Sequence, residues 1–138
     1  MENNQWIEVS AIIAAPMDQI WEKWTQEVHV VHWNFAHESW CCPRAISDLR
    51  VGGKSSYRME AKDGSMGFDL NATFRQIDTN KFIASELEDG RKVEVLFTSI
   101  ENGIRLDQRF EPEGMNPREL QQNGWQAILD HFKAYCEK

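Results

Sequence analysis

The chain is poor in cysteine, and its cysteines are not spaced as disulfide partners. Of the three, Cys41 and Cys42 are neighbours and Cys136 stands alone near the end of the sequence. Because a disulfide between adjacent residues is strained, a small secreted fold held by disulfides is excluded. An odd, unpatterned count is typical of a reducing compartment, so we predict a cytoplasmic protein.

Long apolar runs and an excess of positive charge are also missing. No apolar stretch approaches the ~18 residues that a membrane span needs. Met1–Gln5 has neither the positive region nor the apolar region of a signal peptide. The formal net charge is -7, from 22 acidic and 15 basic residues, so the chain repels phosphate backbones and anionic lipid. We therefore expect no nucleic-acid partner and no insertion into a membrane.

Tryptophan, in contrast, is abundant: there are six in 138 residues, beside seven phenylalanines and two tyrosines. This length fits one domain, residues 1–138, with a substantial core. Rings in this number suit either a thick aromatic core or the lining of an apolar pocket. Composition alone does not separate these two interpretations.

Alternation of apolar and polar residues predicts strands over most of the chain. Residues 6–13 form the first strand, followed by helices over 16–25 and 27–33 and a loop over 34–43. From residue 55 to residue 110, strands alternate with turns, and each strand has one apolar face. The turns are Asp63-Gly64, Asp89-Gly90 and Asn102-Gly103. This pattern predicts an antiparallel sheet that is covered on one side only.

A long helix near the end of the chain is the predicted cover. Asn116 is a suitable N-cap, Pro117 suits the first helical position, and Glu119 stands in a capping-box relation to the cap. The helix is expected to end near Tyr135, with an apolar stripe facing the sheet. Gly124 costs about 1 kcal/mol against alanine in a helix, so its presence suggests that the sheet or a ligand approaches closely. The alternative interpretation, that the helix merely tolerates a glycine at this position, explains the sequence equally well.

We infer an α+β fold in which a curved antiparallel sheet, two short helices and a long C-terminal helix enclose a cavity. Gly52-Gly53 is expected to bend the chain into the sheet with backbone angles that a side chain resists. Gln108 and Glu86 share the parity of apolar residues on their strands, so both are expected to face the dry side. There each needs a partner, which could be a ligand, a water molecule or a neighbouring side chain such as Arg58.

Several segments resemble a known family. They are Trp21-Glu22-Lys23-Trp24, His32-Trp33-Asn34-Phe35, Asp48-Leu49-Arg50-Val51-Gly52-Gly53-Lys54 and Gly124-Trp125. With the order of elements, they resemble the START-like (SRPBCC, helix-grip) superfamily, which includes the birch-pollen-allergen type. Within it, the chain is similar to the branch named after activators of the heat-shock protein 90 ATPase.

The resemblance implies a deep pocket between the sheet and the last helix, which the superfamily uses for lipids, sterols, polyketides and other apolar molecules. We predict that a small hydrophobic or amphipathic molecule binds there. The residues predicted to line the cavity are Trp24, Trp33, Trp40, Tyr57, Met59, Phe68, Leu70, Phe97, Gln108, Trp125, Leu129 and Phe132.

Two other functions stay open. Eukaryotic members of the branch stimulate a chaperone ATPase, but they carry a second domain for which 138 residues leave no room. A chaperone partner is therefore the second hypothesis, and an enzyme acting on a bound hydrophobic substrate is the third. No catalytic centre and no cofactor is evident from the residues, and a homodimer is left open.

Five potential metal ligands lie within 14 positions, from the predicted second helix into the loop that follows it. They are His29, His32, His37, Cys41 and Cys42. Their spacing matches no standard zinc pattern, since neither a Cys-x2-Cys nor a His-x3-His pair is present. We predict no metal site. Cys41 or Cys42 could act as a nucleophile with a nearby histidine, but a buried or loop thiol is the favoured interpretation.

Overall fold

The computed structural model describes residues 6–138, so our interpretation of Met1–Gln5 lies outside the described residues. The elements, in chain order, are β1 (Ile7–Ile13), α1 (Met17–Thr25), α2 (Glu27–Val30), β2 (Trp40–Ser47), β3 (Lys54–Ala61), β4 (Gly67–Asp78), β5 (Phe82–Leu87), β6 (Lys92–Ile100), β7 (Gly103–Phe110) and α3 (Arg118–Cys136). The strands form one antiparallel sheet in the order β1-β7-β6-β5-β4-β3-β2. Within residues 6–138, no helix is long and apolar enough to cross a membrane.

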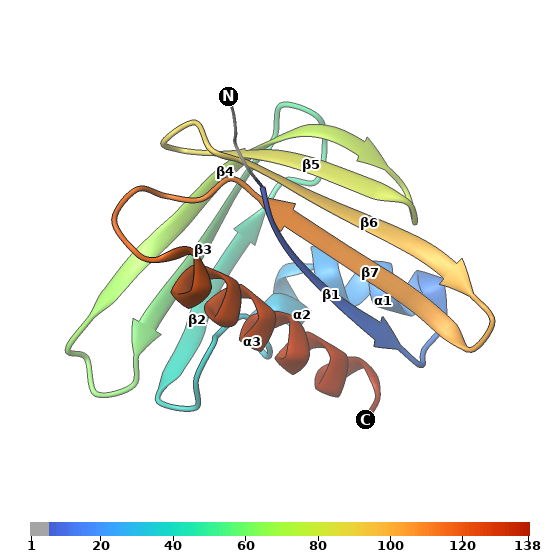
Figure 1. The fold of residues 1–138 in the computed structure, drawn as a ribbon, viewed down its shortest axis with the longest axis horizontal. Coiled ribbons are helices and arrows are strands. Elements are labelled where there is room, and N and C mark those ends of the chain that lie inside the picture. The colour runs from blue at the N-terminus through green and yellow to red at the C-terminus, as the bar shows by residue number, and fades with distance from the viewer. Residues whose placement is uncertain (1–5) are drawn as a thin grey trace.

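The sheet curls around α3, and α1 and α2 close one end of the concave side (Figure 1). This arrangement confirms the predicted α+β helix-grip architecture. The three predicted hairpins are also present: they join β3 to β4, β5 to β6 and β6 to β7. The apolar faces of the strands turn inward, and paired arginine and carboxylate side chains cover the outer face.

The loop between β2 and β3 explains the Gly52-Gly53 pair. Gly52 has a φ of 87°, a left-handed conformation that side chains resist. At Gly53, a Cβ atom would lie 2.1 Å from the carbonyl oxygen of Asp48. Backbone hydrogen bonds join Gly52 N to Phe74 O (2.8 Å) and Phe74 N to Gly53 O (2.9 Å). The loop is thereby fixed to β4 beside its bulge between Phe74 and Gln76. The predicted backbone angle is confirmed for Gly52, whereas Gly53 is required by the close approach of Asp48.

Polar side chains of α3 attach this helix to the free edge of β1. Gln126 Nε2 donates to Ser10 O at 3.0 Å, and Gln126 Oε1 accepts from Ser10 N at 3.3 Å. The neighbouring contacts are Gln122 with Glu8 O, Lys133 with Ile12 O, and Glu137 with Ala14 N. Edge strands expose unpaired backbone groups, and these contacts satisfy them. As a result α3 packs mainly against β1, at one side of the curved sheet.

The main core lies under the second half of α3. Leu129 and Phe132 are fully buried there against Leu106 and Ile13. Trp125, in the first half of the helix, stacks on Phe110 with the ring centroids 3.9 Å apart. The side of α3 that carries Trp125, Leu129 and Phe132 thus faces the concave sheet, as the helical stripe predicted.

The segment from Glu27 to Pro43 differs from the prediction. Helix α2 ends at Val30 instead of Trp33, and hydrogen-bonded turns continue from it to Asn34. The predicted loop over 34–43 is partly strand, because β2 begins at Trp40. The pairing of β2 with β3 shifts between Cys41 and Arg44. A strand with such an irregularity loses its alternating pattern, so the alternation of residues did not predict β2.

The predicted capping box of α3 is wrong. The helix begins at Arg118 after Pro117, without a side-chain cap. The Asn116 side chain instead donates to Glu113 Oε2 at 2.7 Å. Gln121 holds the preceding loop, because its Nε2 donates to Glu113 O and to Asn116 O and its Oε1 accepts from Glu113 N.

Glu86 also lies on the opposite face from the one predicted. It accepts a hydrogen bond from Arg75 Nε at 3.2 Å on the outer side of the sheet. The residues of β5 that face inward are Ile83, Ser85 and Leu87. Because β5 begins with apolar side chains on both faces, the alternation of residues did not show which face points inward, and the prediction took the wrong one.

Candidate functional site

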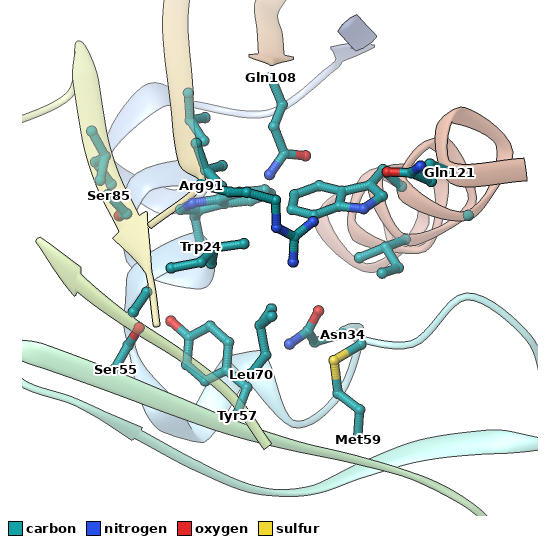
Figure 2. Close-up of a pocket in the computed structure, with 18 of the residues that line it drawn as sticks. Trp24, Asn34, Ser55, Tyr57, Met59, Leu70, Ser85, Arg91, Gln108 and Gln121 are labelled. Atoms are coloured by element: carbon teal, nitrogen blue, oxygen red, sulfur yellow. The ribbon is translucent and has the colours of Figure 1, made fainter. Parts of the chain in front are cut away.

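A cavity of about 420 Å³ separates the concave sheet from the first half of α3. Its wall is mainly apolar, and the sheet, α3 and the α1–α2 region all contribute to it (Figure 2). The apolar side chains of the wall are Trp24, Trp33, Tyr57, Met59, Phe68, Leu70, Ala72, Phe74, Ile83, Leu87, Val93, Val95, Leu120, Trp125 and Ile128. A volume of this size is within the range of small-molecule sites in proteins.

The hollow exists because α3 is fixed at one side of the sheet and carries a glycine where it crosses the gap. Gly124 lies on the cavity wall, and no atom lies within 4 Å of the position that its Cβ would take. Of the two predicted approaches to Gly124, that of the sheet is therefore wrong, and that of a ligand stays a prediction. The missing side chain leaves open space instead.

Aromatic rings form a rigid floor at one end of the cavity. Trp24 and Trp33 stack with their centroids 4.9 Å apart, and Phe132 meets both edge-on at 4.9 and 4.8 Å. Trp33 Nε1 donates to Lys23 O at 2.9 Å, which fixes the indole. The tryptophans thus fill one end of the space and leave the remainder open.

Several polar side chains interrupt the apolar wall. They are Thr25, Asn34, Ser55, Ser85, Arg91, Gln108, Glu113, Asn116 and Gln121, and the hydroxyl of Tyr57 adds a polar group to its ring. Figure 2 shows Asn34, Ser55, Tyr57, Ser85, Arg91 and Gln108 at different heights around the cavity. Gln108 is only 9% exposed, and within residues 6–138 its side chain has no hydrogen-bond partner. Burial raises the pKa of Tyr57 to about 12, so its phenol is neutral at neutral pH.

Eight of the twelve residues predicted to form the cavity line it: Trp24, Trp33, Tyr57, Met59, Phe68, Leu70, Gln108 and Trp125. That any of them contacts a ligand stays a prediction. The other four do not line it. Trp40 sits on edge strand β2, 6.2 Å from the Phe68 ring, and Phe97 packs on Trp21 in the core. Leu129 and Phe132 are fully buried under the second half of α3.

Other lining residues escaped the sequence interpretation. Arg91 follows the Asp89-Gly90 turn, and a charged residue beside a turn is usually at the surface. Asn34 belongs to one of the motifs that carried the family resemblance, but nothing in its spacing indicated that it is buried and faces the cavity. Leu120 and Ile128 lie on the predicted stripe of the last helix, and that stripe was the signal that could have found them.

The histidines and cysteines near β2 form separate contacts. His29 Nδ1 lies 2.7 Å from the Tyr135 hydroxyl, and His37 Nδ1 lies 2.8 Å from Ser39 Oγ. Burial raises the pKa of the Cys42 thiol, whose Sγ donates to Arg44 O at 3.6 Å, so the unreactive thiol form is favoured. Across residues 6–138, no group of three or more His, Cys, Asp or Glu side chains could hold a metal ion.

Comparison with known proteins gives a consistent result. The model of a family described as "Activator of Hsp90 ATPase homolog 1-like protein" matches residues 14–137. A solved AHSA1-like protein from Aeromonas hydrophila is 35% identical, with 95% of this chain and 91% of that chain covered and a TM-score of 0.89. A protein from Cytophaga hutchinsonii is 42% identical, with 94% and 90% covered and a TM-score of 0.82. No curated protein matches the chain.

A more distant protein, from Chromobacterium violaceum, is 17% identical and has a TM-score of 0.85, with 98% of this chain and 99% of that chain covered. At this identity the likeness concerns the fold alone. The curled sheet with its long helix is thus kept across sequences that differ at most positions.

Proposed function

The chain belongs to the family of Activator of Hsp90 ATPase homolog 1-like proteins, and we propose that it binds one small hydrophobic or amphipathic molecule in its cavity. The fold of this family commonly binds hydrophobic ligands. The observation that carries this proposal is the open, mainly apolar space of about 420 Å³ between the sheet and α3. A folded protein fills its interior closely, so a cavity of this size beside a tightly packed core needs an explanation.

The rim of the cavity supports the proposal. Phe68 and Leu120 line the cavity, yet their exposed fractions are 47% and 58%. They come from β4 and from the first turn of α3. Because α3 packs mainly on β1, the space between α3 and β4 offers a route by which an apolar molecule enters.

The proposal is tested with a neutral fluorescent probe, N-phenyl-1-naphthylamine, and with native mass spectrometry of the purified protein. We expect saturable binding at a stoichiometry near one, with energy transfer from tryptophan to the probe. Trp125→Ala should reduce the transfer, because Trp125 is part of the wall. The matched control is Trp6→Phe, since Trp6 lies outside the wall, against the Arg109 guanidinium at 4.4 Å.

If neither the probe nor a lipid extract changes the tryptophan emission or the melting temperature, ligand binding is wrong. The interaction hypothesis then takes its place, and a change in a chaperone's ATPase rate on addition of the protein would be the measurement that supports it.

A further inference from the structure

Among the described residues that line the cavity, Arg91 is the cationic one and Glu113 is the anionic one. Arg91 follows the turn between β5 and β6 and lines the cavity, and Figure 2 shows its guanidinium pointing into the middle of the space. Its Nε donates to Asp89 Oδ2 at 2.7 Å. Within residues 6–138, neither of its two Nη groups has a hydrogen-bond partner.

The amide of Gln108 lines the same cavity as this guanidinium. Figure 2 shows it entering the cavity from β7, above Arg91. Gln108 is more than nine-tenths buried and lacks a protein partner among the described residues. Since buried polar groups are almost always hydrogen-bonded, these donors are suited to a polar atom that a ligand brings.

The carboxylates near Arg91 are already occupied by hydrogen bonds. Asp89 accepts from the backbone N and from Nε of Arg91. Glu113 accepts from Met115 N, Asn116 N and Asn116 Nδ2 at 2.7–2.8 Å. Hydrogen bonds from Asn116 lower the pKa of Glu113, so it is ionised and held in its loop. The Nη groups of Arg91 remain to form the fork that matches a planar carboxylate.

Building on the proposed function, we infer that the ligand is an acidic amphiphile whose carboxylate binds Arg91 and Gln108 while its apolar body lies along Trp125, Leu70 and Trp24. The volume sets the size of this molecule. At ~30 Å³ for each methylene-sized group, about 420 Å³ holds an alkyl chain of roughly 14 non-hydrogen groups. A twelve-carbon fatty acid has this size, so dodecanoate is a suitable probe. N-phenyl-1-naphthylamine also fits, because aromatic rings occupy less volume for each atom than methylene groups do.

The experiment compares dodecanoate with 1-dodecanol and dodecylammonium, each below its aggregation concentration, by displacement of N-phenyl-1-naphthylamine. We expect dodecanoate to bind at least about tenfold more tightly than the neutral alcohol, and the cation to bind least. Arg91→Met should weaken dodecanoate binding at least about tenfold and change dodecanol binding by less than about threefold. Gln108→Leu should weaken the binding of dodecanoate, and its affinity for dodecanol should be unchanged or higher.

Arg75→Met is the matched control, because it removes the same charge from an outer-face pair with Glu86. It should leave all three affinities unchanged. Retained binding of the neutral probe shows that each variant is folded. If Arg91→Met does not fold, Arg91→Lys replaces it. This variant should weaken the binding of dodecanoate but not of the other two compounds, because lysine keeps the charge but cannot form the two parallel hydrogen bonds of a guanidinium.

Two outcomes overturn the inference in distinguishable ways. If dodecanoate and dodecanol bind equally, or if Arg91→Met and Arg75→Met weaken dodecanoate equally, the acidic head group is wrong while the cavity still binds apolar molecules. If the neutral probe also fails to bind the wild-type protein, the proposed function itself fails.

Discussion

Gly124 gives a test in which a gain of stability and a loss of binding come from the same position. The residue lies in the interior of α3 on the cavity wall, and a Cβ added there meets nothing within 4 Å. Glycine costs about 1 kcal/mol relative to alanine in a helix interior. Gly124→Ala should therefore raise the free energy of unfolding by about 1 kcal/mol.

The expected change in melting temperature follows from the chain length. At ~2.1 cal/mol/K for each residue, unfolding of this chain has an entropy of roughly 0.3 kcal/mol/K. A gain of 1 kcal/mol then raises the melting temperature by about 3–4 °C. Differential scanning calorimetry and urea denaturation measure the two quantities. Ala134→Gly is the reciprocal control at an exposed position of α3, and it should lower the stability by about 0.5–1 kcal/mol.

A larger side chain at the same position should remove the binding space. The phenylalanine side chain has seven non-hydrogen atoms, which at ~30 Å³ each occupy roughly half of the cavity. Gly124→Phe should therefore abolish binding of N-phenyl-1-naphthylamine without unfolding the protein.

If Gly124→Ala lowers the free energy of unfolding by 1 kcal/mol or more, the position is not open, because an atom must then pack against it. If Gly124→Phe binds the probe with unchanged affinity, the probe does not bind in this cavity.

Three further predictions concern core packing, the contact of α3 with the edge strand, and the titration of Tyr57. Phe132→Ala should cost about 3–5 kcal/mol in urea denaturation, because the ring is fully buried, and a loss below 1 kcal/mol would contradict its place in the core. Gln126→Ala removes two hydrogen bonds to Ser10 and should cost about 1–3 kcal/mol with faster exchange of the Ser10 amide, whereas Asn123→Ala should change stability by less than about 0.5 kcal/mol. Tyr57 has its pKa raised by burial from 10.0 to about 12, so the unfolded chain loses its proton first and stability falls as the pH rises through this interval; Tyr57→Phe should remove this part of the decline, and equal slopes for the two proteins would contradict it.

The sequence by itself determined the elements whose signals are local. Alternating apolar residues defined most strands, and the Asp63-Gly64, Asp89-Gly90 and Asn102-Gly103 turns defined their connections. The long apolar stripe of the last helix, read with period 3.6, correctly indicated that its Trp125 side faces the sheet. These patterns are local because each depends on neighbours within a few residues.

Long-range pairing decided what the local patterns could not. Strand β2 was missed because the bulge after Cys41 breaks its alternation, and the strand is recognised only by its pairing with β3. The capping box at Asn116 failed because Glu113 competes for the same side chain. In both cases the outcome depends on contacts that the alternation and cap patterns do not contain.

The candidate site depended most on the tertiary structure. The sequence placed several aromatic residues near the cavity, since they lie on faces with a regular period. It could not separate Leu129, which is fully buried, from Trp125, which lines the cavity, because both lie on the same helical stripe. Arg91 follows a turn and looks like a surface residue, yet its guanidinium points into the cavity that Gln108 also lines. Periodicity determines which face of an element is apolar, whereas the curvature of the sheet and the attachment of α3 to β1 determine where space remains between those faces.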